Sequence, residues 1–229
     1  MHIANNILKH SLQNVYFLTG TAMAGKTTMA GELSKKYGFI HFNDNWHEQS
    51  FKEWQSIIDK KYQARAAKGQ AVTDWEAYFD RSVEEFLALG DYNGYDEYLE
   101  FAPVELIKLS QTGKVVADVS FPVELLVEIS DYNSVACLLA SPELVNCRTY
   151  GAREDHMEFL ECILLLNEPE KKMAVQDELF RIGIEKISEE VRKSNLFSIT
   201  RTDKSTIEGT LKMLEDHFGL SSVHDLKGS

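Results

Sequence analysis

The residues best suited to chemistry form a short loop near the N-terminus in which two glycines stand five positions apart. It reads GTAMAGKT from Gly20 to Thr27 and fits the pattern GxxxxGK[ST]. Glycines let the backbone turn and approach an anion closely, so that consecutive N–H groups point at phosphate oxygens. Lys26 can then bind the β- and γ-phosphates, and the Thr27 hydroxyl can bind Mg²⁺. The motif predicts binding of ATP and Mg²⁺ with contacts from Gly20, Thr21, Ala22, Met23, Ala24, Gly25, Lys26, Thr27 and Thr28.

A second carboxylate-bearing position follows an apolar run later in the chain. Asp118 stands within Val115–Val119, and a valine rather than a glutamate comes after it. A lone aspartate there suits a contact to magnesium-bound water, whereas a hydrolytic ATPase would place an acidic pair to activate water. Asp118 is therefore predicted to join Thr27 at the metal, although an aspartate that ends a strand also commonly caps the following turn. A guanine-binding NKxD sequence is absent, which argues against a GTPase.

Asp44 is a candidate for the reacting end of a second substrate. It follows the apolar run 39–42, so it would lie at the C-terminal edge of a sheet, where parallel α/β folds bind their ligands. A carboxylate at that edge can orient or deprotonate an acceptor hydroxyl. The other interpretation is an N-cap for a helix that begins near Trp46.

The elements that must position these residues follow an alternating pattern. Short runs rich in β-branched and aromatic residues, without strict alternation, are typical of strands covered on both faces. They predict strands at residues 15–19, 39–42, 115–119, 134–140 and 196–200. Helices are predicted at residues 27–37, 103–111, 157–166, 170–193 and 206–218. Gly38 is expected to end the first of these helices, and Pro103 to stand in the first turn of the second. The alternation of strands and helices predicts an α/β fold with a parallel sheet.

One region is too long to be a plain crossover between strands. About seventy residues, from 43 to 112, separate the second and third predicted strands. They hold all three tryptophans and many tyrosines, and several of the aromatic residues recur at helical spacing. The pattern predicts a helical insertion with a small core of its own, in which some rings also line a substrate pocket.

Composition excludes several classes of partner. The net charge of −12 lacks the positive footprint that nucleic acid or an anionic membrane surface selects. Three cysteines without a CxxC spacing argue against a disulfide scaffold or a zinc site. The first residues carry no pattern of a signal peptide, and no apolar run is long enough to span a membrane. We expect a cytoplasmic monomer or homodimer.

With these features the sequence resembles the nucleoside-monophosphate-kinase-like branch of P-loop kinases, which includes adenylate, shikimate and gluconate kinases. The loop GTAMAGKTT carries the resemblance within residues 15–30, and the rest is a match of layout. It implies a three-layer α/β/α fold whose five-stranded parallel sheet has the order 2-3-1-4-5. It also implies one kinase-like domain over residues 1–229, an acceptor-binding insertion at 43–112 and a lid at 148–157.

The resemblance also assigns roles to three arginines. Arg148 and Arg153 lie in the lid range, where such arginines close over the transferring phosphoryl group and stabilise its charge. Their other interpretation is as solvated side chains paired with Glu154 and Asp155. Arg201 lies after the last strand, in the loop that borders the adenine in this group, and is predicted to stack on the base.

Two functions follow as hypotheses. The first is an ATP-dependent phosphotransferase, a small-molecule kinase that moves the γ-phosphate of Mg·ATP to a hydroxyl or phosphate of a metabolite. Lys26, Asp44, Arg148 and Arg153 would be its catalytic residues. The alternative is a nucleotide-binding regulatory or sensor protein that transfers no phosphate. Few basic residues and many acidic ones in 43–112 make a neutral or cationic acceptor at least as plausible as a nucleotide.

Overall fold

The computed structural model describes residues 5–43, 60, 63, 74–89, 95–146 and 157–220. The chain divides into two compact units. The sheet unit comprises residues 1–45, 101–144 and 184–229, and the helical unit comprises residues 46–100 and 145–183. Each unit is thus built from segments that are far apart in the sequence.

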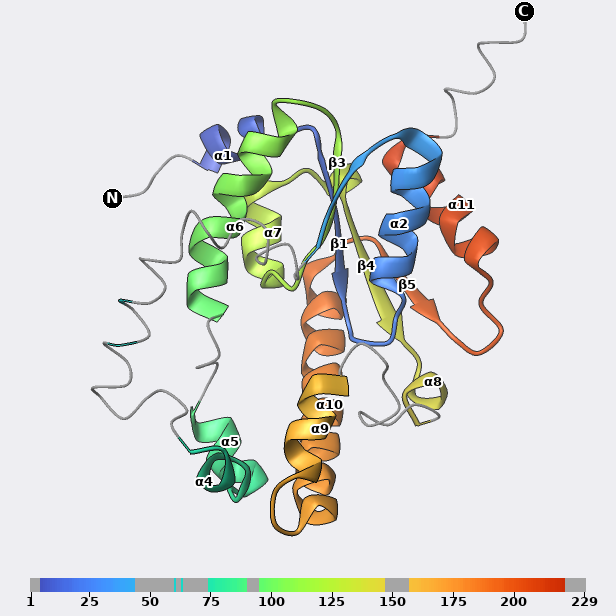
Figure 1. Cartoon of the computed structure of the whole chain (residues 1–229). Coiled ribbons are helices and arrows are strands. Elements are labelled where there is room, and N and C mark those ends of the chain that lie inside the picture. The colour runs from blue at the N-terminus through green and yellow to red at the C-terminus, as the bar shows by residue number, and fades with distance from the viewer. Residues whose placement is uncertain are drawn as a thin grey trace, which may run out of the picture. The chain divides into compact units, whose positions relative to one another are not determined.

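The sheet unit is organised around five parallel strands in the order β2-β3-β1-β4-β5 (Figure 1). The strands are β1 (Val15–Gly20), β2 (Ile40–Phe42), β3 (Val115–Asp118), β4 (Val135–Ala140) and β5 (Ser198–Arg201). The predicted number of strands, their parallel direction and their order are confirmed. Parallel strands all end at the same edge of a sheet, so the C-terminal ends of β1 and β3 lie next to each other.

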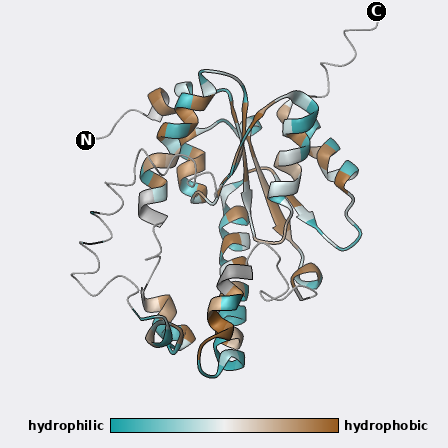
Figure 2. Cartoon of the chain, in the orientation of Figure 1, coloured by the Kyte–Doolittle hydropathy of each residue, from teal (hydrophilic) through white to brown (hydrophobic). Residues whose placement is uncertain are grey.

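Burial explains why these runs form strands. Every residue of β3 and β4 is buried, and Figure 2 shows β4 as hydrophobic along its length. Phe17 and Leu18 of β1 are fully buried between these two strands. Continuous apolar sequence with both faces covered is the signature of a parallel sheet rather than of a solvated antiparallel one.

Helices cover the sheet on both faces. Helices α2 (Lys26–Tyr37) and α11 (Ile207–Phe218) lie on one face, and α1 (Asn5–Ser11), α6 (Tyr95–Ser110) and α7 (Val123–Ile129) lie on the other (Figure 1). Gly38 adopts a left-handed conformation with φ +69° and donates its N–H to Ser34 O, so it ends α2 as predicted. The predicted three-layer α/β/α class is therefore confirmed. The remaining short elements of this unit are the 3₁₀ turn η2 (Tyr132–Ser134) and the start of α8 (Pro142–Asn146).

The prediction for Pro103 was wrong. Helix α6 begins at Tyr95, eight residues earlier, and Pro103 stands inside it. A proline fits the first turn of a helix best, because its missing N–H removes a hydrogen bond anywhere further in. Ala102 and Leu106, spaced one turn apart on either side of Pro103, are both fully buried. Packing of this apolar face keeps the helix continuous through the proline.

The helical unit contains α4 (Trp75–Phe79), α5 (Val83–Leu89), α9 (Met157–Leu164) and the first part of α10 (Pro169–Ser194). Asp74 caps α4 by accepting a hydrogen bond from Ala77 N at 3.2 Å. Phe79 is 1% exposed, and the rings of Trp75 and Tyr78 pack against it. These rings cluster around Phe79 in the described part of the insertion, while Trp75 is half exposed, and a separate core for the insertion stays a prediction. No helix among the described residues is long and apolar enough to cross a membrane.

Candidate functional site

The predicted phosphate-binding loop joins β1 to α2, and two glycines make its shape possible. Gly20 has φ +117° and Gly25 has φ +80°, conformations that a residue with a side chain rarely adopts. A Cβ atom at position 20 would lie 2.0 Å from the carbonyl oxygen of Leu138 in β4. The loop is therefore pressed against the neighbouring strand at a point where only glycine fits.

Thr21 fastens the first half of the loop to β4. Its N–H donates to Leu138 O at 3.0 Å, and its hydroxyl accepts a hydrogen bond from Ala140 N at 2.7 Å. The side chain is fully buried. Both groups of Thr21 thus extend the hydrogen bonding of the sheet into the loop, which holds the loop in register with the strand beside it.

The second half of the loop leads directly into α2. Gly25 is the N-cap of this helix, and no side chain caps its first turn. The first N–H groups of a helix have no partners within it and carry the positive end of its dipole. At the same turn, Lys26 Nζ donates to Thr21 O at 3.0 Å, which places the ammonium over the loop. Backbone amides and a lysine are thereby gathered at the position where phosphates bind in loops of this kind.

The two predicted metal ligands are brought together beside the loop. The Thr27 hydroxyl donates to Asp118 Oδ2 at 2.5 Å, across 91 positions of sequence. Asp118 is 5% exposed at the end of β3, whereas Thr27 is exposed at the start of α2. A hydroxyl and a carboxylate supply the oxygen ligands that Mg²⁺ takes, with phosphate and water oxygens completing its shell. The residues present therefore fit this ion, while the described residues contain no cluster of three or more His, Cys, Asp or Glu that could hold a metal.

His41 lies near Asp118 and has an unusual environment. It stands on β2 opposite Val116 of β3, two positions before Asp118. Burial lowers the pKa of His41 below its ordinary value of 6.5, and the nearby charge of Asp118 opposes that shift only in part. Its Nε2 atom is buried with no hydrogen-bond partner among the described residues. His41 is thus held in its neutral form at neutral pH.

Arg201 approaches the loop from the other side. It is the last residue of β5, and its Nη1 donates to Ala24 O at 2.9 Å. The predicted stacking of Arg201 on an adenine base stays a prediction, but its guanidinium lies on the phosphate-binding loop. The family resemblance led to that prediction through the position of Arg201 after the last strand, whereas nothing in the local sequence indicated its contact with Ala24.

Three predicted site residues lie outside the described residues. They are Asp44, Arg148 and Arg153. Their roles at the acceptor and at the transferring phosphoryl group remain predictions.

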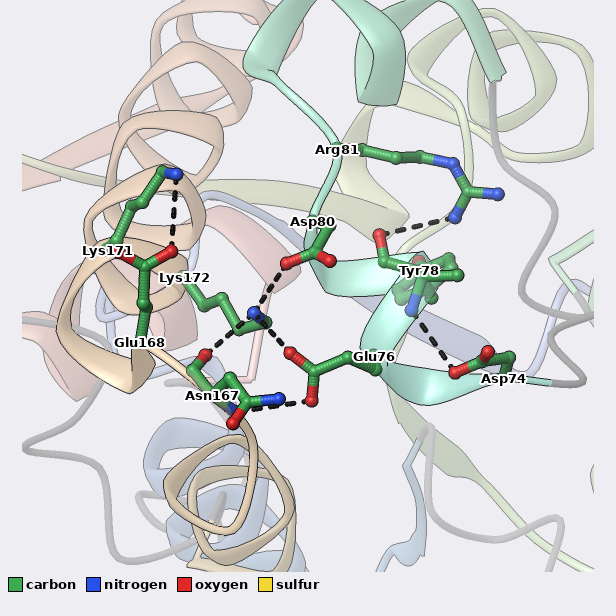
Figure 3. A network of polar contacts seen from close by, with 10 residues as sticks. Asp74, Glu76, Tyr78, Asp80, Arg81, Asn167, Glu168, Lys171 and Lys172 are labelled. Atoms are coloured by element: carbon green, nitrogen blue, oxygen red, sulfur yellow. Dashed lines mark hydrogen bonds and ion pairs between the residues drawn. The ribbon is translucent and has the colours of Figure 1, made fainter.

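A second polar cluster, in the helical unit, centres on Lys172 (Figure 3). Its side chain is 3% exposed, and Nζ donates to Glu76 Oε1 at 2.8 Å, Asp80 Oδ1 at 2.6 Å and Asn167 O at 2.7 Å. All three hydrogens of the ammonium are therefore bound. Its hydrogen bonds to Asp80 and then Glu76 raise the pKa of Lys172, and its hydrogen bond lowers the pKa of Glu76. We call these four residues the Lys172 cluster; they fasten α4 to the turn before α10 and to its first residues.

Sequence reasoning missed the Lys172 cluster. Lys171 and Lys172 are identical neighbours in the sequence, yet Lys171 is 75% exposed and pairs loosely with Glu168 at 3.6 Å. A lysine near the start of a helix interacts unfavourably with the helix dipole, and this is the one feature of the sequence that marks the position as unusual. That feature does not distinguish between the two lysines.

Comparison with solved structures finds similar chains, among them two shikimate kinases. The shikimate kinase from Bacteroides thetaiotaomicron is 16% identical, with 90% of this chain and 98% of that chain covered and a TM-score of 0.45. The shikimate kinase from Acinetobacter baumannii, in complex with shikimate, is 16% identical, with 95% and 99% covered and a TM-score of 0.44. Both are shikimate kinases, which belong to the group that the sequence resembles. At such identity and TM-scores the similarity carries no inference about substrate or activity, and the fold class follows from the observed strand order.

No protein-family model matches the sequence, and no curated protein matches it significantly. What the protein does is therefore inferred from the geometry of the loop and of the residues around it.

Proposed function

We propose that the protein is an ATP-dependent phosphotransferase that moves the γ-phosphate of Mg·ATP to a small-molecule acceptor. The observation that carries the proposal is the Thr27–Asp118 pair beside the loop that carries Lys26. A hydroxyl and a carboxylate meet there, next to a helix N-terminus and an ammonium. Such an arrangement suits a nucleoside triphosphate with its metal ion.

Each group has a defined task in this proposal. The N–H groups of the loop and of the first turn of α2 bind phosphate oxygens, and Lys26 neutralises charge on the β- and γ-phosphates. Thr27 and Asp118 hold the magnesium ion and its water, and the ion supplies charge neutralisation for the phosphate oxygens. Asp44 is proposed to orient the acceptor hydroxyl, and Arg148 and Arg153 to stabilise the transferring group.

We further propose that the acceptor is an uncharged or cationic compound with a hydroxyl group. The insertion, residues 43–112, holds more acidic than basic residues and only two arginines, Arg65 and Arg81. Arg81 is already engaged, because its Nη1 donates to Tyr78 O at 3.2 Å and its guanidinium lies 5.1 Å from the centre of the Tyr78 ring. Recognition of an acceptor phosphate usually takes arginines with their forked donors directed at the anion. The low number of arginines in the insertion argues against a phosphate-bearing acceptor.

Binding is tested with Lys26→Ala, measured by calorimetry with Mg·ATP. We expect a large loss of affinity in a protein that stays folded, because the side chain of Lys26 lies at the loop and is not part of the buried core. Lys35→Ala is the matched control, since Lys35 is an exposed lysine on the last turn of the same helix. Equal ATP affinity in the wild type and in Lys26→Ala would overturn the site.

Transfer is tested by ATP consumption against a set of acceptors. The set pairs uncharged and aminated polyols with phosphorylated and carboxylated compounds of similar size. We expect consumption with members of the first group. Consumption with the second group alone would overturn the acceptor proposal, and tight ATP binding without consumption by any acceptor would favour a sensor.

Kinetic measurements distinguish the roles proposed for Arg148 and Arg153 from the role of a residue that only binds ATP. Arg148→Ala and Arg153→Ala should lower kcat far more than they weaken ATP binding, because they would act mainly in the transition state. Variants with the kcat of the wild type would exclude that role.

A further inference from the structure

Arg201 has a contact that is unusual for a residue expected to stack on a base. Its guanidinium reaches back from the end of β5, and Nη1 donates to the carbonyl oxygen of Ala24 inside the loop. A Cβ atom built on Gly25 would lie 1.9 Å from the same Nη1 atom. The guanidinium therefore lies directly against the loop, immediately before the first residue of α2.

This contact completes the attachment of the loop to the sheet. Thr21 ties the first half of the loop to β4 through Leu138 and Ala140. Arg201 ties the second half to β5, and its own carbonyl accepts a hydrogen bond from Ser141 N at 2.8 Å, just after β4 ends. Two successive strands thus hold the two halves of the loop, and the second attachment is a side chain.

That side chain also brings charge. An arginine stays protonated at any working pH, so Arg201 adds a fixed positive charge beside the loop. The chain as a whole has a net charge of −12, which repels a nucleoside triphosphate at a distance. Together with Lys26, Arg201 offsets this repulsion where the phosphates would bind.

We propose that Arg201 is a positioning residue for the phosphate-binding loop and the second positive charge of the triphosphate site, acting on the phosphates and not on the base. The inference rests on the proposed nucleotide binding and deepens it. The inference leads to an expectation that base stacking does not share. Loss of Arg201 must weaken a ligand that has phosphates but no base as strongly as it weakens ATP.

The test compares two probes, Mg·ATP and magnesium tripolyphosphate, by calorimetry on the full chain. Arg201→Ala should weaken both by the same factor, about tenfold, the size expected for loss of one charge-assisted hydrogen bond. Arg201→Lys keeps the charge without the fork, and Arg201→Gln keeps a donor without the charge, so both should fall between the wild type and Arg201→Ala. Lys204→Ala, an exposed lysine three residues further along the chain, is the matched control and should bind both probes as the wild type does.

The outcomes separate the two hypotheses. A loss of ATP affinity with unchanged tripolyphosphate affinity would overturn the inference in favour of stacking on the base. Unchanged affinity for both probes in Arg201→Ala, or in Arg201→Gln where the alanine variant does not fold, would overturn it in favour of a purely structural contact. Failure of the wild type to bind either probe would instead overturn the proposed function itself, and it is recognised before any variant is compared.

Discussion

The loop between β1 and α2 and the Lys172 cluster both join segments that are remote in sequence, but they do so with different chemistry. Each attachment of the loop involves a backbone group: the close approach of Gly20 to Leu138, the hydrogen bonds of Thr21, and the hydrogen bond from Arg201 to Ala24 O. The Lys172 cluster is held by ionised side chains, with one ammonium shared between Glu76 and Asp80.

This difference in chemistry is the one expected between the proposed ligand site and a purely structural contact. In the Lys172 cluster, the three hydrogens of the ammonium all have protein partners, two of them carboxylates. At the loop, main-chain dipoles and positive side chains converge, which favours an anion from outside the protein. The buried ammonium of Lys172 is therefore neutralised by protein groups, whereas the partly exposed positive groups at the loop suit the proposed anionic ligand.

The largest effect is expected from Gly20→Ala. The added Cβ would meet the Leu138 backbone at 2.0 Å, in a conformation with φ +117° that alanine adopts only under strain. We expect ATP affinity to fall at least about 100-fold, because displacement of the loop would disorganise every phosphate contact at once. Calorimetry with Mg·ATP measures the loss, and retained affinity would show that the close approach to β4 is dispensable.

Lys172→Met should have the next largest effect, confined to the helical unit. It removes the shared ammonium and leaves two carboxylates side by side, so we expect the thermal midpoint to fall by several degrees. Hydrogen exchange should rise in residues 74–80 and 167–172, while ATP affinity stays as in the wild type. Lys171→Met is the control, because its partner Glu168 is 71% exposed and a surface pair contributes little. If Lys172→Met and Lys171→Met lowered the thermal midpoint equally, the Lys172 cluster would contribute no more to stability than a surface ion pair does.

The same cluster predicts an acid sensitivity with a definite sign. The hydrogen bond from Lys172 lowers the pKa of Glu76 from its ordinary value of 4.5, so the unfolded chain binds this proton at a higher pH than the folded one. The corresponding stability is present above pH 4.5 and is lost as the pH falls through the lowered pKa. Unfolding at pH 6 and pH 4 should show this loss in the wild type and a smaller one in Lys172→Met.

His41 differs from Glu76 in that its buried Nε2 atom has no hydrogen-bond partner among the described residues. Its pKa is lowered by burial, so below about pH 6.5 the unfolded chain takes up a proton that the folded chain does not. The free energy of unfolding should then fall with decreasing pH, by at most about 1.4 kcal/mol per pH unit for one proton.

His41→Leu should flatten this dependence between pH 6.5 and 5, as measured by denaturant unfolding. His10→Gln, at an exposed position on α1, should leave it unchanged. An unaltered slope in His41→Leu would assign the dependence to other groups.

The smallest effect, and the reverse of Gly20→Ala, is expected from Gly31→Ala. Gly31 lies inside α2, and a Cβ atom built there meets nothing within 4 Å. Alanine should stabilise the protein by about 0.5–1 kcal/mol, because it restricts the unfolded chain and favours the helix. A destabilised Gly31→Ala would show that α2 tolerates no addition near the loop.

Much of the sheet unit was predictable because its signals are local. Apolar runs such as Val135–Ala140 identify buried strands, and a GxxxxGKT pattern between a strand and a helix predicts a phosphate-binding loop. Strand ends differ from prediction by one or two residues, since fraying at ends depends on neighbours. The strand order came from the family resemblance, and the pairing of the strands confirms it.

Features that depend on long-range packing were not predictable. Helix α6 continues through Pro103 because buried residues on both sides of the proline pack against the core. A prediction from the local sequence takes account only of the hydrogen bond that proline cannot make. Arg201 likewise has a contact 177 positions away, at Ala24, that no spacing in the sequence announces.

By itself the sequence determined the chemistry available to this protein: a glycine-bounded loop with Lys26 and Thr27, a lone Asp118 and an acidic surface. Residue type and short-range spacing define such features, because the backbone conformation of a loop depends on its own glycines. Thr27 and Asp118 were predicted to lie together, but the tertiary structure alone decided the contacts of Arg201 with Ala24 and of Lys172, rather than Lys171, with Glu76. Those pairings depend on the burial and direction of each side chain, which are settled only when distant segments pack together.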